Sequence, residues 1–389
     1  MPEPTSAAPG APVSTAAPDA IVIGAGPGGL AAAAALRQRG LRPLVLERGE
    51  RLGTSWRNHY DRLRLHTTRR MSALPGLSIP RSYGRWVRRD DVVRYLERYA
   101  EHHDLDVATG IEVTRVERTD SGWELPATGG RVLNSPVVVV ATGHNHTPYI
   151  PDWPGRNTFS GDLLHASAYR NAGPYAGRDV LVVGVGNTGA ELAVDLVEGG
   201  AARVRLAVRT PPHVMRRSTA GWPAQASGIL VRRLPTAVVD RVAPYIEKVS
   251  VPDLSAYGLP RPRTGLYARV LDGAIPVQDV GLIAAVRSRR VEPVAAVERL
   301  DGDRVHLADG SVVEPEVIIA ATGYRRGLEP LVGHLGVLDG RGRPLVHGAR
   351  TPPGAPGLYF TGFTNPISGM FREMAIDARK IARAAGRRR

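Results

Sequence analysis

The chain has 389 residues, an apolar fraction of 43% and no cysteine. This length allows two domains. The missing cysteine excludes a disulfide framework, a thiolate metal site, a CxxC redox pair and a cysteine nucleophile. We therefore predict no metal site and expect any redox chemistry to come from a bound cofactor.

The formal net charge is +14 and comes almost entirely from arginine. The arginines are spread along the chain without an aromatic-and-basic recognition module, so we predict no nucleic-acid partner. Residues 1–18 are rich in proline, alanine, serine and threonine, which predicts a disordered tail. The tail lacks the regions of a signal peptide, and no apolar run approaches the ~20 residues that span a bilayer. We expect a cytoplasmic protein with no membrane partner, and a homodimer stays open.

The first folded segment predicts a dinucleotide-binding unit. A short apolar strand over 21–23 leads into the GxGxxG of residues 24–29, an alanine-rich helix over about 30–38 and a second strand over 43–46. The first glycine of such a motif makes the turn, the second admits a pyrophosphate and the third lets the helix approach the strand. The pyrophosphate lies on the helix N-terminus, and Glu47 follows the second strand, where it can accept a ribose hydroxyl.

The same pattern recurs in the middle of the chain. A strand over 180–183 leads into the GxGxxG of residues 184–189 and a helix over about 188–197. At the end of the next strand, where the first copy has Glu47, this copy has Arg209. An acid repels a 2′-phosphate, whereas arginine holds one through paired N–H donors. The first site therefore suits FAD or NAD, and the second suits NADPH.

Further apolar strands complete the two units. Residues 137–145 and 317–324 each run a strand with the look of one buried on both faces into Ala-Thr-Gly. The glycine lets the backbone pass close to a ligand. A strand over 357–361 and a helix over about 373–385 would return the chain to the first unit.

The connector FSGDLLHASAY carries a resemblance to a known family. On the strength of this connector and the two dinucleotide units, the chain resembles the flavin-containing monooxygenases, which are class B flavin-dependent monooxygenases. Residues 46–68 and 159–196 look most like the YUCCA-type branch of that family. The segment GLYFTGFTNPISG near the C-terminus is also similar. The family motif FxGxxxHxxxY is matched by Phe159, Gly161, His165 and Tyr169.

The resemblance implies an α/β fold with two Rossmann-like dinucleotide-binding domains, one for FAD and one for NADPH, the second inserted in the first. The FAD domain would comprise residues 19–150 and 326–389. The NADPH domain would comprise residues 151–325, with the linker motif over 159–169 and a helical excursion over 210–282. The excursion would either wall the substrate cavity or lie at the surface without ligand contact.

The resemblance also implies an activity. NADPH would reduce FAD, and a flavin C4a-hydroperoxide would insert one oxygen atom from O2 into a small organic substrate, which is an amine, a sulfide or a 2-oxo acid. Two alternatives stay open, an NADPH-dependent flavoprotein reductase or dehydrogenase and Baeyer–Villiger oxygenation of a ketone. Baeyer–Villiger enzymes have tryptophan and proline at the positions of Tyr169 and Arg170. This difference argues against Baeyer–Villiger oxygenation without excluding it.

Two histidines are candidate catalytic residues. His66 falls where animal members of the family carry an asparagine beside the flavin, and a neutral imidazole could hydrogen-bond there; a buried structural histidine is the other interpretation. His165 would hold the two domains together, act in catalysis or simply fill a packed linker. The candidate cofactor-binding residues are Gly24, Gly26, Gly28, Gly29, Glu47, Arg48, Trp56, His66, Thr142, Gly143, Gly184, Gly186, Asn187, Thr188, Gly189, Arg209, Thr210, Thr322, Gly323, Tyr324 and Gly362.

The 2′-phosphate assignment leads to a first prediction. Replacing Arg209 by alanine should weaken the binding of NADPH far more than that of NADH, because only NADPH carries the phosphate that the guanidinium would hold. Binding of both nucleotides is measured by titration. An equal loss for both would remove the assignment.

Overall fold

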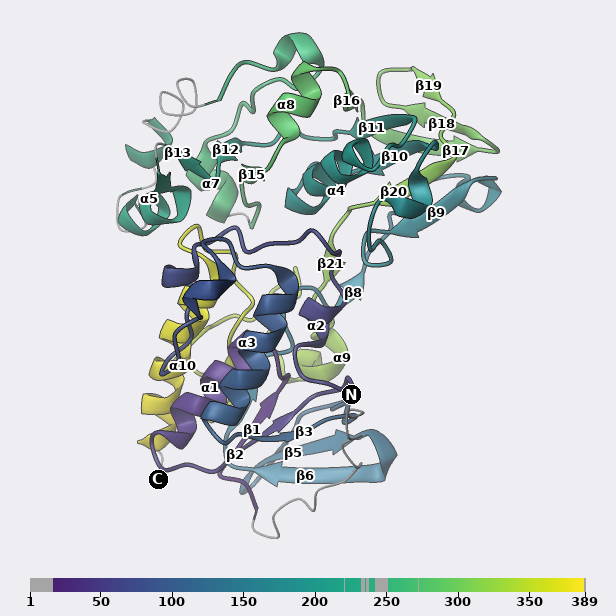
Figure 1. The fold of residues 1–389 in the computed structure, drawn as a ribbon. Helices are drawn as coiled ribbons and strands as arrows, with labels where there is room; N and C mark the ends of the chain where they lie inside the picture. Colours follow the sequence, from purple (N-terminus) through teal and green to yellow (C-terminus); the bar gives the residue numbers. More distant parts are fainter. Residues whose placement is uncertain are drawn as a thin grey trace, which may run out of the picture.

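The computed structural model describes residues 17–387 except 220, 232–234, 236, 237, 242–250 and 272. Most of the predicted tail therefore lies outside the described residues. Its last two residues are bonded to the fold, because the carbonyl oxygens of Ala17 and Pro18 accept hydrogen bonds from Arg42 and Ser135. The described chain forms two lobes, one above the other in Figure 1.

The lower lobe is built on a parallel five-stranded sheet in the order β22-β7-β1-β2-β3. Every residue of β1 and β2 is buried, as in a parallel sheet covered on both faces. Alternate residues serve two cores: Val22 packs with the helices, and Ile23 packs with Trp123 of an antiparallel sheet. The strands are β1 (Ala20–Ile23), β2 (Pro43–Leu46), β3 (Asp106–Ala108), β7 (Val138–Val140) and β22 (Leu358–Phe360), with β4 (Glu117–Thr119), β5 (Gly122–Ala127) and β6 (Arg131–Ser135) in the antiparallel sheet.

The helices of the lower lobe come from both ends of the chain (Figure 1). Helix α1 begins at Pro27, three residues before the predicted start, because proline suits the first turn of a helix. It packs along α10, which joins the C-terminal segment to the N-terminal sheet. The helices are α1 (Pro27–Arg37), α2 (Thr54–Arg57), α3 (Arg89–His102), α9 (Glu329–Val332) and α10 (Met370–Gly386).

The upper lobe repeats this plan with a parallel sheet in the order β16-β11-β10-β20-β9. An antiparallel meander of three strands follows, and Asp-Gly pairs at residues 301–302 and 309–310 lie at its turns. The fold class, two Rossmann-like units in an α/β chain, is confirmed. The elements are β9 (Asp162–His165), β10 (Asp179–Val183), α4 (Asn187–Glu198), β11 (Arg203–Ala207), α8 (Leu282–Arg287), β16 (Glu292–Val294), β17 (Val297–Asp301), β18 (Arg304–Leu307), β19 (Val312–Val313) and β20 (Val317–Ala320).

Two crossing segments join the lobes, and they pair with each other. Strand β8 (Thr147–Pro148) runs antiparallel to β21 (Tyr324–Arg325), and the pair lies between the lobes in Figure 1. We call this two-stranded connection the hinge ribbon. The predicted junctions near residues 150 and 325 fall beside it, and the exact domain boundaries stay predictions.

The described part of residues 210–282 combines short helices with short strands, and the helical excursion stays a prediction. Strands β12 and β15 pair in parallel, so the two ends of the segment lie side by side. Periodicity could not reveal a pairing between strands about 60 residues apart. The elements are β12 (Val214–Arg216), β13 (Ser218–Thr219), β14 (Trp222–Pro223), α5 (Ala224–Val231), α7 (Leu266–Leu271) and β15 (Val277–Asp279).

Candidate functional site

The two glycine turns are built alike. A Cβ on Gly29 would lie 1.8 Å from the Gly24 carbonyl oxygen, and one on Gly189 would lie 1.8 Å from the Gly184 carbonyl oxygen. Only glycine therefore permits these contacts between turn and helix. A Cβ on Gly26 or on Gly186, in contrast, would have no neighbour within 4 Å.

The open middle glycines leave room for a phosphate group at the N-termini of α1 and α4, which suits a dinucleotide at each turn. Gly28 lies between Gly26 and Gly29 in the sequence, and a Cβ on it would lie 3.2 Å from the Met374 sulfur.

The strand register corrects one prediction about the second turn. Ile23 pairs with Leu46 in the first unit and Val183 pairs with Ala207 in the second, so the residue equivalent to Glu47 is Val208. Arg209 stands one position further on and is exposed, as is Thr210. A 2′-phosphate role for Arg209 stays a prediction. Arg209 is an exposed residue one position beyond the counterpart of Glu47.

Glu47 already has backbone partners. Its carboxylate is buried and accepts hydrogen bonds from the Ala25 and Gly49 N–H groups, both at 2.9 Å. It thus ties the first glycine turn to the end of β2. A carboxylate has lone pairs to spare, so a ribose hydroxyl could still donate to it.

Unpaired hydroxyls lie at the carboxyl ends of adjacent strands in the lower sheet. Thr142 follows β7 and Thr361 follows β22, and the Thr361 N–H donates to Val140 at 3.1 Å. The side-chain oxygens of both threonines are buried with no hydrogen-bond partner in the described chain. Gly143 and Gly362 stand beside them with positive φ. Because ligands of α/β sheets bind outside the carboxyl ends of the strands, these orphaned hydroxyls fit a bound FAD.

Other predicted cofactor residues are held by protein contacts. Arg48 bonds His146 at 2.9 Å, and Trp56 packs edge-on against Phe371 with ring centroids 5.6 Å apart. Asn187 bonds to the strand β15 segment, accepting from the Gln278 N–H at 2.7 Å. The Trp56 ring is half-buried and packs against the hydrophobic core of the lower lobe.

The linker motif forms an edge strand, β9, of the upper sheet rather than a free strip between domains. A Cβ on Gly161 would lie 2.4 Å from the Glu316 carbonyl oxygen, which explains the glycine. The Tyr169 ring is fully buried, and its hydroxyl donates to Asp195 of α4 at 2.6 Å.

His165 ties this edge strand to the hinge. Its Nε2 donates to the Gly323 carbonyl at 2.9 Å, its Nδ1 accepts from the Ser167 N–H at 3.0 Å, and its ring meets Tyr324 edge-on at 4.9 Å. Burial lowers its pKa, so the ring is neutral near pH 7. Since both ring nitrogens are occupied, the geometry favours a positioning role for His165 over a catalytic one. Thr322 supports the same hinge by donating to the Tyr149 carbonyl.

The loop over residues 58–66 belongs to the lower lobe in sequence but contacts α4 of the upper lobe. Tyr60 is buried in the upper hydrophobic core. Arg62 pairs with Asp195 at 3.2 Å and with Glu198 at 3.0 Å. The Nε2 atom of His66 lies 3.0 Å from Oε1 of Glu191. Three acids on one face of α4 therefore bind the loop that contains His66, and we call this set, Glu191, Asp195 and Glu198, the acidic face of α4.

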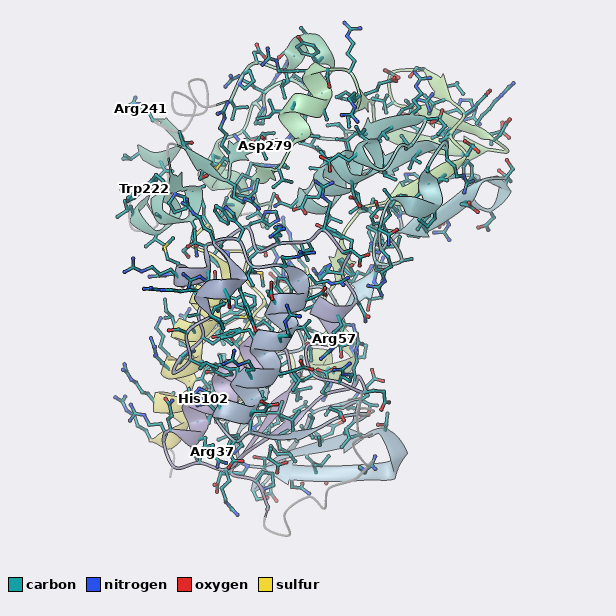
Figure 2. The ribbon with its side chains drawn as sticks, viewed as in Figure 1. Arg37, Arg57, His102, Trp222, Arg241 and Asp279 are labelled. Carbon is teal, nitrogen blue, oxygen red and sulfur yellow. The ribbon has the colours of Figure 1, made fainter. Side chains whose placement is uncertain are left out.

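Sequence reasoning missed the acidic face and a second contact between the lobes. The buried side chain of Gln225 accepts from the Thr68 N–H at 2.9 Å and donates to the Ser368 carbonyl at 2.9 Å. The sequence does carry a signal for the acidic face, because α4 is otherwise an apolar, buried helix and has two acids four residues apart. Nothing in the sequence marked Gln225. The exposed Trp222 lies near it at the outer side of the upper lobe (Figure 2).

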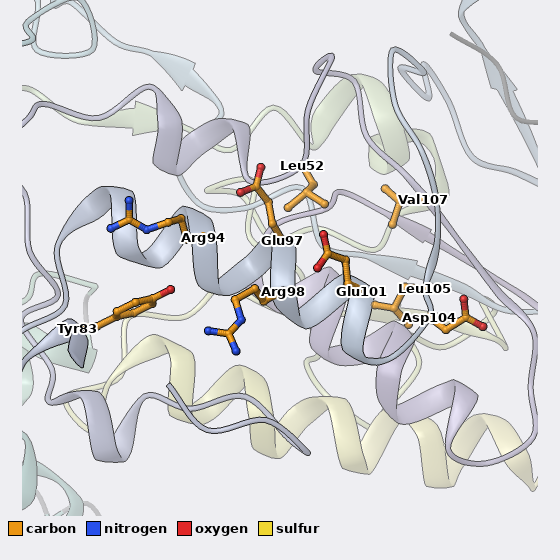
Figure 3. A pocket seen from close by; sticks show the side chains of 10 residues that line it. Leu52, Tyr83, Arg94, Glu97, Arg98, Glu101, Asp104, Leu105 and Val107 are labelled. Carbon is orange, nitrogen blue, oxygen red and sulfur yellow. The ribbon is translucent and has the colours of Figure 1, made fainter. Parts of the chain in front are cut away.

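A surface depression of about 660 Å³ lies along α3 (Figure 3). Two of its three carboxylates already have partners, since Glu97 pairs with Arg51 at 3.0 Å and Asp104 pairs with Arg37. We therefore assign no cofactor to it. The described residues hold no cluster of three or more metal-ligating side chains, and none of their helices has the length and apolarity needed to cross a membrane.

Two glycine turns, each opening a helix at the carboxyl edge of its own parallel sheet, define the class: a flavoprotein fold with two dinucleotide sites. A family model described as pyridine nucleotide-disulphide oxidoreductase matches residues 21–224. Indole-3-pyruvate monooxygenase YUCCA1 of Oryza sativa subsp. japonica is 37% identical over 353 residues, which cover 89% of this chain and 87% of the relative. Probable indole-3-pyruvate monooxygenase YUCCA1 of Arabidopsis thaliana is 35% identical, with 94% and 89% covered.

Solved structures agree. A mutant flavin monooxygenase from Stenotrophomonas maltophilia has a TM-score of 0.72 at 25% identity, with 96% of this chain and 98% of that chain covered. Cyclohexanone monooxygenase shares the fold, with a TM-score of 0.71 at 20% identity and coverage of 96% and 88%. The chain belongs to the flavin monooxygenases within the pyridine nucleotide-disulphide oxidoreductase family. It is an NADPH-dependent monooxygenase with FAD and NADPH as cofactors, and its lack of cysteine separates it from enzymes that reduce disulfides through a cysteine pair.

The positioning and the catalytic interpretation of His165 can be separated by mutation. A positioning role predicts that His165→Ala changes the rate of NADPH oxidation by less than about tenfold and leaves its pH profile unchanged, whereas loss of a general acid or base costs about 10²–10⁴-fold. Steady-state kinetics between pH 6 and 9, a window chosen to bracket the ordinary imidazole range of about 6.5, provides the measurement. Loss of one limb of the pH profile would restore the catalytic interpretation.

Proposed function

We propose that this protein oxygenates a small 2-oxo acid. The observation that carries the proposal is a group of basic side chains at the carboxyl ends of β7 and β22. We call His144, Arg326, Arg343 and His347 the basic cluster.

The members of the basic cluster repel one another. Burial, with the charges of Arg326 and Arg343, lowers the pKa of His144 to about 4. Burial and the charge of Arg343 likewise lower the pKa of Arg326. Burial, with the charges of Arg326 and Arg350, lowers the pKa of His347. Both histidines are therefore neutral near pH 7, and the like charges that the fold holds together are those of Arg326 and Arg343. Asp339 and Glu329 offset part of this repulsion, and a bound anion would offset more.

Several nitrogens of the cluster also lack partners. Arg326 Nε, His144 Nδ1 and His347 Nε2 are buried without a hydrogen-bond partner among the described residues. Buried donors that remain unpaired are costly, and a carboxylate is a strong acceptor for a guanidinium. An anionic group of a substrate would therefore meet both the charge and the open donors.

The position of the cluster suits a substrate site. His144 Nε2 lies 3.3 Å from the side-chain nitrogen of Asn365, which also donates to the Gly273 carbonyl at 3.3 Å. Gly273 belongs to the segment over 210–282, so residues of that segment cover the cluster from the upper lobe. Such a location, outside the carboxyl ends of parallel strands, is where α/β proteins bind their ligands.

The relatives point the same way. Both plant relatives are named for indole-3-pyruvate, which is a 2-oxo acid and carries a carboxylate at neutral pH. In such a reaction FAD and NADPH supply the reducing electrons and the activation of O2. The residues of this chain bind the carboxylate, orient the carbonyl and exclude water.

The overall reaction can be written so that it balances. A 2-oxo acid, O2, NADPH and a proton would give an acid one carbon shorter, CO2, water and NADP⁺. The direct test follows NADPH oxidation, O2 uptake and CO2 release together in the FAD-loaded protein. Equal amounts support the proposal. Hydrogen peroxide release without CO2, with every 2-oxo acid supplied, would contradict it.

Three further points rest on the sequence and stay proposals: a cytoplasmic location, a homodimer and the lack of a nucleic-acid partner. The substrate and O2 are the small-molecule partners of the reaction. Fractionation of cells and light scattering of the purified protein test the first two.

Removing the Arg326 guanidinium gives a sharp prediction. Arg326→Ala should raise KM for a 2-oxo acid roughly thirtyfold, because a hydrogen bond to a charged group contributes about 2 kcal/mol. KM for a neutral sulfide should stay within about threefold, since a sulfide has no carboxylate. The control is Arg325→Ala, because Arg325 is exposed and lies over the Tyr149 ring, 4.8 Å from its centroid.

Two results would contradict the assignment. An equal rise in KM for both substrates would show that the cluster does not select a carboxylate. Loss of FAD from the Arg326 variant would show instead that the cluster holds a phosphate of the cofactor.

A further inference from the structure

The acidic face of α4 has no counterpart in the otherwise equivalent helix α1. Counting from the first glycine of each turn, Glu191 corresponds to Ala31 and Asp195 corresponds to Ala35. Ala31 and Ala35 are buried, at 0% and 4% exposure, and Glu191 is 3% exposed. The second helix therefore places a carboxylate where the first keeps a methyl group. A buried carboxylate is expensive unless it is paired, so its partners indicate its purpose.

The partners of Glu191 come from the loop of the opposite lobe. Oε1 lies 3.0 Å from His66 Nε2, and the Tyr60 hydroxyl hydrogen-bonds the same carboxylate. Burial and the charge of Glu191 raise the pKa of Tyr60 well above its ordinary value, so this phenol keeps its proton and donates it to Glu191. Thr188, a predicted cofactor residue of the second glycine turn, also bonds the Tyr60 hydroxyl. Glu191 and Tyr60 thus join the second glycine turn to the loop that contains His66.

The contact with Glu191 determines how the His66 ring is used. His66 Nε2 and Glu191 Oε1 are not aligned for a hydrogen bond, and Oε1 has no hydrogen-bond partner among the described residues. The negative charge of a carboxylate 3.0 Å away still favours the hydrogen on the ring nitrogen that faces it. In a neutral imidazole the other nitrogen is then an acceptor. That other nitrogen, Nδ1, is buried and has no hydrogen-bond partner within the described chain.

We propose that Glu191 is a positioning residue: it holds His66 in the tautomer with hydrogen on Nε2, so that Nδ1 accepts a hydrogen bond from an N–H or O–H group of a ligand bound where the lobes meet. The ligand would give Nδ1 the hydrogen-bond partner that the described chain does not provide. Its chemistry is that of an amide, a ring N–H or an enol hydroxyl, all of which occur among a nicotinamide, a flavin and a 2-oxo acid. The consequence for catalysis rests on the monooxygenase function proposed above, whereas the tautomer does not.

Neighbouring groups support a fixed carboxylate at this point. Arg217 lies on the excursion side, over the Trp86 ring at 4.4 Å, and the charge of Glu191 partly offsets the burial that lowers the pKa of Arg217. On the loop side, burial and Arg170 lower the pKa of His59 to about 4, so His59 is neutral and does not compete as a cation. His66 is thus the histidine whose ring lies in direct contact with Glu191.

The first experiment reads the tautomer directly. Protein with ¹⁵N-labelled histidine and bound FAD is studied by long-range ¹H–¹⁵N correlation at about pH 8, above the ordinary imidazole pKa, and His66 is assigned from a His66→Gln spectrum. The wild-type ring should carry its hydrogen on Nε2. Glu191→Ala, which introduces the residue that α1 has, should lose this preference, whereas Glu298→Ala, at an exposed glutamate of β17 far from the acidic face, should retain it.

The second experiment measures what the positioning does. Glu191→Ala should keep KM for NADPH within about threefold of wild type but lower the product formed per NADPH at least fivefold, with hydrogen peroxide accounting for the difference. Glu298→Ala, at an exposed position of β17, should match wild type in both quantities. Glu191→Gln, which keeps the shape of the side chain, serves in case the alanine variant does not fold, and it should lower the yield in the same direction.

Each outcome has a meaning. A wild-type ring with its hydrogen on Nδ1 overturns the proposal whether or not any variant folds. An unchanged product yield in the Glu191 variants overturns the positioning role, and a large rise in KM for NADPH assigns Glu191 to nucleotide binding instead. If wild-type protein oxygenates no substrate at all, the proposed function fails while the tautomer result still stands.

Discussion

The acidic face of α4 is the contact on which the arrangement of the two lobes depends. Asp195 receives the buried hydroxyl of Tyr169 at 2.6 Å and the guanidinium of Arg62 at 3.2 Å. Tyr169 belongs to the linker motif and Arg62 to the loop of the lower lobe, so one carboxylate joins three parts of the chain. Removing one partner from a half-buried, hydrogen-bonded charge is costly, which favours one geometry at this junction.

A second contact closes the other side of the junction. Gln225, from the excursion of the upper lobe, bonds the backbone of Thr68 and Ser368 in the lower lobe. The two contacts flank the carboxyl ends of both sheets, where the glycine turns lie. The hinge ribbon, with His165 bonded to Gly323, sets the third point. Three points of attachment fix the orientation of two rigid bodies, and this orientation is what hydride transfer between two bound nucleotides requires.

The sequence predicts what depends on local spacing. The glycine turns, the strands that precede them and the antiparallel meander follow from motifs and periodicity, because each is fixed by residues a few positions apart. The match of Arg209 to Glu47 is wrong, because the sequence alone does not show at which residue β11 stops pairing with β10. The pairing of β12 with β15 and the contacts of Gln225 were not foreseen, because they join residues far apart in the chain. His66 was singled out from family position, but its partner Glu191 required the fold.

The most direct test of this account measures the relative position of the lobes. Because the chain has no cysteine, two introduced cysteines, Glu101→Cys on α3 and Arg287→Cys on α8, take spin labels at those sites alone. Pulsed electron resonance of the FAD-loaded protein should give one narrow distance distribution, and adding Asp195→Ala should broaden it clearly. A distribution that stays equally narrow without the Asp195 carboxylate would contradict the claim that the acidic face of α4 fixes the two lobes.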